Sequence, residues 1–198
     1  GLARYAFEQG HPYWGYRFMG WGLHYIQDLT QPYHSKVLPG VETPDLIWTA
    51  AKDAAGFPED KQAAIARVAN RHTALEKFQL KWLQQLLRDG ENASPLLQAY
   101  AQADKDASYP AFDSGYLRNV VSAQAFARAD QLDALLAQSL TAAEQAPGFS
   151  ASNQLAVEPA PSAELNALLI ELIGNFGAHS RNAVRATVPA AAQVPATD

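Results

Sequence analysis

Apolar side chains recur every three or four residues along most of the chain, which is the spacing of one face of an α-helix. Alternation of apolar and polar residues, the pattern of a half-buried β-strand, is nearly absent. The longest stripe contains Ile65, Val68, His72, Leu75, Trp82 and Leu86, and two others contain Leu132, Leu135, Leu136 and Leu140, and Leu165, Leu168, Leu169, Leu172 and Ile173. The pattern predicts an all-α protein.

Capping residues and helix breakers divide the pattern into separate helices. Thr43-Pro44 and Ser94-Pro95 each have proline at a first helical position, and Ser162 is a typical N-cap. The signals predict helices over residues 14–29, 43–55, 61–88, 94–105 and 116–145, and from 162 to about 173, with turn-rich segments at 106–115 and 146–161. We expect a single-domain helical bundle over residues 1–187 and a flexible tail over residues 188–198.

Composition excludes several classes of protein. At 198 residues, with 48% apolar and 18% charged residues, the chain fits one globular domain. Its net charge of −5 provides no basic surface for nucleic-acid phosphates, so we expect no stable nucleic-acid partner. The absence of cysteine excludes disulfides and thiolate metal sites. No run reaches the roughly 18 apolar residues of a transmembrane segment, and the opening GLARYAFEQG lacks a signal-peptide pattern.

The histidines and carboxylates follow a metal-binding pattern, H-x3-D-x5-H and later H-x3-E, formed by His24, Asp28, His34, His72 and Glu76. Residues four apart lie on one face of a helix, so each pair can close on one ion. Imidazole nitrogen and carboxylate oxygen are ligands that Zn²⁺ prefers. The pattern predicts a metal-dependent hydrolase.

The simpler interpretation of either pair is a surface ion pair. His72, however, lies on the predicted apolar stripe, with Glu76 at its edge. A buried imidazole or carboxylate needs a partner or a cation. We therefore predict that both pairs point inward and share one metal cluster, since the pair of His24 and Asp28 has apolar neighbours in Phe18, Trp21 and Tyr25.

The first predicted helix is also rich in glycine and aromatic residues. Gly15, Gly20 and Gly22 indicate close packing of another helix, with access for a ligand as the alternative. We expect most of the aromatic side chains to lie in the core, and one or two to line a pocket or meet a lipid interface.

Residues 14–80 resemble the zinc-dependent phospholipase C family, through the stretches RFMGWGLHYIQDLTQPYHS and RHTALEKF. The wider superfamily includes the S1/P1 single-strand nucleases, and its members are all-helical with a trinuclear zinc site. The resemblance implies a secreted or periplasmic bacterial enzyme that releases phosphocholine and diacylglycerol from phosphatidylcholine at a membrane or micelle surface. It also implies a helical bundle built around a multinuclear zinc site.

Carried over by position, the resemblance implies a complete site of two or three Zn²⁺ ions. Asp28 would bridge two ions and be the residue most important for catalysis, and His24 would bind one of them. His34, His72 and Glu76 would hold another. Glutamate in the second pair, the lack of cysteine and the acidic charge favour the phospholipase branch over the nucleases.

Two departures from the family affect these expectations. Further family ligands lie upstream of the first pair, but only 23 residues precede His24, so we expect the chain to be the C-terminal part of a longer protein. His11 is the one upstream histidine, either a further ligand or a residue of the His11-Pro12 turn. The 37 residues between His34 and His72 imply an inserted helix over residues 44–55 that reshapes the substrate mouth.

The remaining histidine, His179, fits no pair, and we expect it at the surface or at a helix end. Two other functions stay open beside the phospholipase. One is a nuclease of the S1/P1 type. The other is a helical domain that binds zinc only for stability or associates with membranes.

Overall fold

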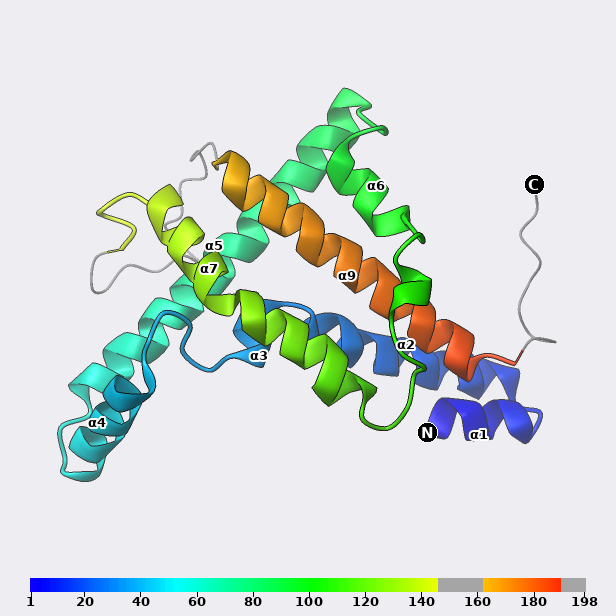
Figure 1. Cartoon of the computed structure of the whole chain (residues 1–198), viewed down its shortest axis with the longest axis horizontal. Helices are drawn as coiled ribbons and strands as arrows, with labels where there is room; N and C mark the ends of the chain where they lie inside the picture. The colour runs from blue at the N-terminus through cyan, green and yellow to red at the C-terminus, as the bar shows by residue number, and fades with distance from the viewer. Residues whose placement is uncertain (146–161, 190–198) are drawn as a thin grey trace.

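The computed structural model describes residues 1–145 and 162–189, and all regular structure in these ranges is helical, as predicted (Figure 1). The predicted turn segment 146–161 and residues 190–198 of the predicted tail lie outside the described residues. The α-helices are α1 (Leu2–Glu8), α2 (Pro12–Leu29), α3 (Pro32–Ser35), α4 (Thr43–Ala54), α5 (Glu59–Asp89), α6 (Pro95–Ala101), α7 (Ala123–Ser139) and α9 (Ala163–Thr187). A 3-10 turn spans Asp106–Ser108, and a π-helix, Leu117–Ser122, leads into α7.

Several helix ends follow the sequence signals. The hydroxyls of Ser94 and Ser162 cap α6 and α9 by accepting backbone N–H bonds. Gly90 ends α5 in the left-handed conformation, with φ of 70°, and its N–H bonds the last carbonyls of the helix. The N-cap of α4 is Glu42 rather than Thr43, and it makes no side-chain capping bond.

Other boundaries differ from the prediction. Helix α6 ends at Ala101, four residues short of the predicted end, and α9 continues to Thr187, well beyond Ile173. Val188, predicted to begin a flexible tail, is buried against Ala3 and Met19. The end of α9 is therefore part of the packed structure.

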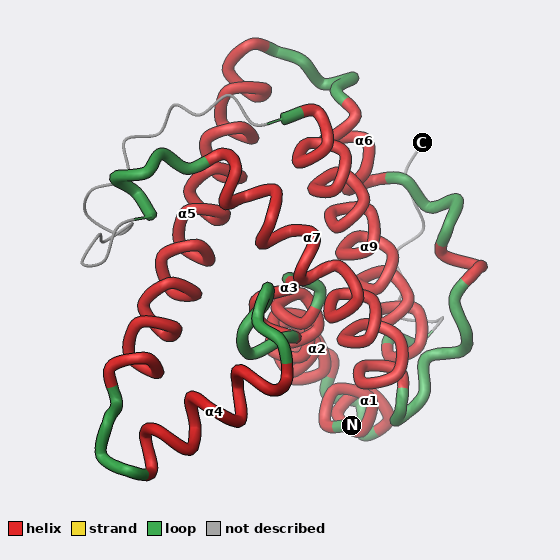
Figure 2. The backbone as a smooth tube through the Cα atoms, turned by 60° about the vertical axis from the view of Figure 1, so that its left-hand side comes forward, coloured by secondary structure: helices red, strands yellow, loops and turns green. Residues whose placement is uncertain are grey.

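The main core forms where α5, α7 and α9 meet. Leu75, Leu132 and Leu169 are fully buried there, with Val68, Phe78 and Trp82 packed against the cluster. Ile65, predicted on the buried stripe, is 56% exposed. The first half of α5 extends beyond the bundle, paired there with α4, and the two form a hairpin arm, residues 43–69 (Figures 1 and 2).

The glycine prediction for α2 holds at one position. A Cβ on Gly15 would lie 2.6 Å from the Phe7 ring, so α1 packs closely against α2 there. Nothing lies within 4 Å of the corresponding point on Gly20 or Gly22, so the prediction of close packing is wrong at these two positions.

The prediction of a largely buried aromatic stretch is also wrong, because most of its members are exposed: Tyr13, Trp14, Tyr16, Trp21 and Tyr25.

None of the described helices combines the length and apolar character that crossing a bilayer requires. Most aromatic side chains of α2 lie on the solvent-exposed face of this helix. On α2 they form a chain of ring contacts from Tyr13 to Trp21, through Trp14 and Phe18.

Candidate metal centre

His34, His72 and Glu76 come together where α3 meets the middle of α5. Nε2 of His34 lies 3.1 Å from Nε2 of His72, which lies 3.0 Å from Oε1 of Glu76. One ligand atom from each residue lies within 4.8 Å of the others. Ligands held at about 2.0–2.2 Å by a tetrahedral zinc ion are about 3.3–3.6 Å apart. The donor types and spacing therefore fit a zinc ion with little movement of the side chains.

The second predicted pair lies on α2, with His24 Nε2 3.3 Å from Asp28 Oδ2. The side chains are 70% and 39% exposed, so the prediction that this pair points into apolar surroundings is wrong. Glu76 is likewise 59% exposed rather than facing the core. Because these carboxylates remain hydrated, neither pair needs a cation to be stable, and the metal assignment depends on geometry.

One pocket of about 270 Å³ is lined by the first pair and by Glu76 of the second. His34 also lines it, so α2, α3 and α5 all contribute potential ligands. Helices α6 and α9 contribute mainly apolar side chains to the lining: Tyr100, Leu172, Ile173 and Phe176. The pocket thus combines possible metal ligands with apolar side chains.

The local sequence explains the position of His34. The Gln31 side-chain oxygen accepts the Tyr33 N–H at 2.6 Å, and Pro32 begins the single turn of α3 with a preset φ. The hydroxyl of Ser35 donates to the Leu29 carbonyl, which closes the turn back onto α2. The Gln31-Pro32-Tyr33-His34 turn therefore aims His34 at α5.

A network of buried polar side chains helps to hold the candidate metal ligands in position. The ring of Tyr33 stacks on that of His72, with centroids 6.1 Å apart, and its hydroxyl donates to Asp133 Oδ1 at 2.8 Å. Asp133, buried on α7, also pairs with Arg71, the neighbour of His72. Burial, and then the charge of Asp133, raise the pKa of Tyr33, which keeps the phenol a neutral donor. The network ties Tyr33, on which the His72 ring stacks, to α7.

The loop after α3 is anchored to α7 as well. The carboxylate of Asp130 accepts from Lys36 Nζ and from the Gly40 N–H, and these bonds, the Gly40 bond foremost, lower the pKa of Asp130. Gly40 has φ of 73°, and a Cβ there would lie 2.8 Å from Asp133. Only glycine fits this position without strain. The loop therefore holds α3, and with it His34, in register with α7.

Sequence reasoning missed Asp133, Asp130 and Tyr33 as supports of the centre. Asp133 gave one usable signal, a carboxylate beside Leu132 on a predicted apolar helix, which requires a buried partner. The partner could not be identified, because Tyr33 is 100 residues away in sequence.

The two remaining histidines lie away from the centre. His11 is the N-cap of α2, about 20 Å along the helix from His24, and makes no side-chain capping bond. The structure does not bring it to the pocket. His179 is only 1% exposed and bonds the Tyr116 hydroxyl and Gln124 Oε1, each at 2.9 Å. The prediction of a surface or helix-end histidine is wrong, since α9 continues through it.

No family model, curated protein or solved structure matches this chain. Any function assigned to the pocket therefore depends on its side chains and their geometry.

Proposed function

We propose that the chain contributes a zinc centre to phosphodiester hydrolysis, with phosphatidylcholine as the substrate and a phospholipase C reaction as the activity. The observation that supports this most is that His34, His72 and Glu76 offer three ligand atoms within 4.8 Å, at a pocket that Asp28 and His24 also line. Three protein ligands around zinc leave an open position, the arrangement of catalytic rather than structural sites.

Each side chain has a distinct role in this proposal. His34, His72 and Glu76 would hold the first ion. His24 and Asp28 would hold a second ion more weakly, because they provide only two ligands. Asp28, which lines the same pocket, would be the ligand shared by the two ions. Zinc ions bound in this way supply Lewis-acid chemistry to the phosphodiester and a nucleophile from water at neutral pH.

The residues around the ligands orient the reacting groups. Tyr33, held by Asp133, keeps the His72 ring in place. Gln31 has a buried side-chain amide nitrogen with no hydrogen-bond partner among the described residues, and it lies at the pocket. We assign it a donor role toward a phosphoryl oxygen, which would satisfy that amide.

Two features favour a lipid over a nucleic acid. The pocket wall on α9 is apolar, and the chain carries a net charge of −5, which opposes binding to a polyanion. A choline headgroup is a cation and meets no such repulsion. The activity therefore suits a zwitterionic lipid.

The test measures phosphocholine release from phosphatidylcholine in mixed micelles, beside cleavage of single-stranded DNA, with zinc and with chelator. The proposal predicts release that chelator abolishes and zinc restores. Asp28→Asn should lose it, while Asp45→Asn, at an exposed aspartate of α4 outside the pocket, should keep it.

The other outcomes assign different functions. Faster cutting of DNA than of lipid would make the chain a nuclease with the same centre. Tightly bound zinc without turnover on either substrate would make it a zinc-stabilised helical domain.

A further inference from the structure

A second, separate hollow lies between α4 and the first half of α5. It has a volume of about 460 Å³, within the range of small-molecule sites. Its walls include Val37, Leu38, Leu46, Ile65 and Val68. This groove exists because the chain inserts α4 between the two halves of the metal motif.

Some residues of the groove are close in sequence to the metal-ligand candidates. Ile65, Val68, His72 and Glu76 are spaced by three and four residues, so they follow one face of α5. Val68 lies one turn before His72. Val37 and Leu38 follow His34 by three and four residues. Val37, Leu38 and Val68, which line the groove, are therefore each within four residues of a metal-ligand candidate.

The lining of the groove suits an aliphatic chain. Its charged members, Lys61 and Asp53, pair with each other, Nζ to Oδ2, at 2.7 Å. Most other lining side chains are apolar, so few groups could satisfy the N–H and C=O groups of an extended peptide. A hydrocarbon chain has no such groups and gains from the apolar contact.

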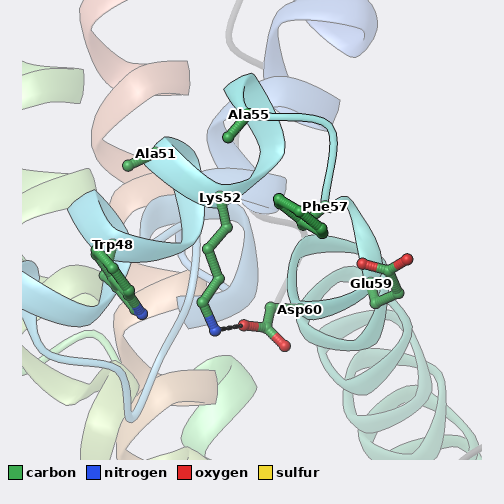
Figure 3. Close-up of a pocket in the computed structure, with 7 residues that line it drawn as sticks. All are labelled: Trp48, Ala51, Lys52, Ala55, Phe57, Glu59 and Asp60. Carbon is green, nitrogen blue, oxygen red and sulfur yellow. Dashed lines mark hydrogen bonds and ion pairs between the residues drawn. The ribbon is translucent and has the colours of Figure 1, made fainter.

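The same arm also carries exposed aromatic side chains. Figure 3 shows Trp48 and Phe57 on either side of the Lys52–Asp60 ion pair. These residues line a hollow of about 520 Å³. Both aromatic side chains are largely exposed, as is Ile47. Exposed tryptophan and phenylalanine side chains suit the interface of a lipid surface. The arm thus carries both exposed aromatic side chains and an apolar groove.

We propose that the groove between α4 and α5 holds one acyl chain of the phospholipid whose phosphodiester lies at the metal centre. This inference rests on the proposed function and extends it, because it assigns the inserted arm to lipid recognition. In this proposal α4 determines which lipid binds. The face of α5 that continues beyond the groove carries the metal ligands for the reaction.

The test uses the 198-residue chain in chelator, so that no turnover interferes. A fluorescent fatty acid bound to the protein is displaced by lysophosphatidylcholines of increasing chain length, each below its critical micelle concentration. Burial of a methylene contributes about 0.8 kcal/mol, so each added methylene should tighten binding up to about fourfold until the groove is full. Affinity that does not depend on chain length would overturn the inference.

Matched variants locate the binding site. Ala64→Phe fills the groove from α5 and Ala50→Phe from α4, whereas Ala63 is exposed and does not line the groove. Ala64→Phe and Ala50→Phe should each weaken binding at least tenfold, and Ala63→Phe should leave it unchanged. Circular dichroism verifies that each variant is folded. Wild-type affinity in both groove variants would refute the assignment. It would also be refuted if sedimentation showed a dimer that the two groove variants dissociate, because a second copy of the chain would then occupy the groove.

The two proposals fail separately. If the protein hydrolyses phosphatidylcholine but its affinity for lipid does not depend on chain length, the groove assignment is wrong and the proposed metal chemistry stands. If it binds acyl chains but hydrolyses no phosphodiester, the groove assignment stands and the proposed function is wrong.

Discussion

Protonation of His179 should destabilise the protein, because its ring is buried between α7 and α9. Tyr116, Tyr109 and Gln124 contact the ring, and the charge of Asp106 also acts on it. Burial lowers the pKa of His179 from 6.5 to about 4, against a smaller opposing effect of Asp106. The folded protein therefore holds this histidine neutral at pH values where the unfolded chain protonates it.

The sign and size of the effect follow from these two pKa values. The unfolded state binds more protons below about pH 6.5, so the free energy of unfolding falls as the pH drops toward 4. With pKa values of about 6.5 and 4, the loss is about 2 kcal/mol between pH 7 and pH 5 and about 3 kcal/mol below pH 4. Above pH 7 the histidine contributes almost no pH dependence.

The assay is urea unfolding at pH 7 and pH 5 in chelator, for the wild type and for His179→Gln. Glutamine removes the titration and keeps a polar group near Tyr116 and Gln124. The wild type should lose about 2 kcal/mol more than the variant between the two pH values, whatever the baseline stability of the variant. Equal losses in both proteins would refute the burial argument, since every other titrating group is common to them.

Three further predictions concern the centre and its supports. Asp28→Asn should reduce phosphodiester turnover by orders of magnitude, as about 4 kcal/mol of lost transition-state stabilisation implies, while the circular dichroism spectrum stays unchanged; near-normal turnover would contradict the bridging role. In elemental analysis, His72→Ala should contain one tightly bound zinc fewer than the wild type. In chelator, the substitution should change the free energy of unfolding by less than about 1 kcal/mol, because Glu76 is exposed. A large loss of stability in chelator would mean that the pair of His72 and Glu76 has a structural role. Asp133→Ala should lower the free energy of unfolding by about 3–5 kcal/mol, because it leaves Arg71 and the Tyr33 hydroxyl unpaired. Asp130 is largely exposed, so Asp130→Ala should lower it by only about 1 kcal/mol. Similar losses for the two variants in denaturant unfolding would show that the burial of Asp133 does not make it more important for stability.

The sequence predicted the helices because their apolar periodicity and caps are local signals. Ser94 and Ser162 act where the signals indicated. The pairing of His72 with Glu76 is also local, because the two residues lie one turn apart on α5. His34 is 38 residues from His72, and only the resemblance implied that the two would meet.

Burial of single residues could not be predicted, because it depends on which helices pack together. Aromatic neighbours of His24 suggested a buried face, but the outer side of α2 is open to solvent. His179 was expected at the surface or at a helix end, because the last predicted helix ended at about residue 173. Gly177 instead allows α6 to approach α9, since a Cβ there would lie 2.6 Å from the Tyr100 carbonyl oxygen. A small residue at a helix–helix contact and one at a helix end look alike in sequence.

The metal centre itself is tested most directly by diffraction from crystals soaked in zinc, with data collected on both sides of the zinc absorption edge. We expect an anomalous peak about 2.0–2.2 Å from His34 Nε2, His72 Nε2 and a Glu76 carboxylate oxygen, with a weaker second peak beside Asp28 and His24. Zinc bound elsewhere on the surface, with no peak between His34 and His72, would contradict it.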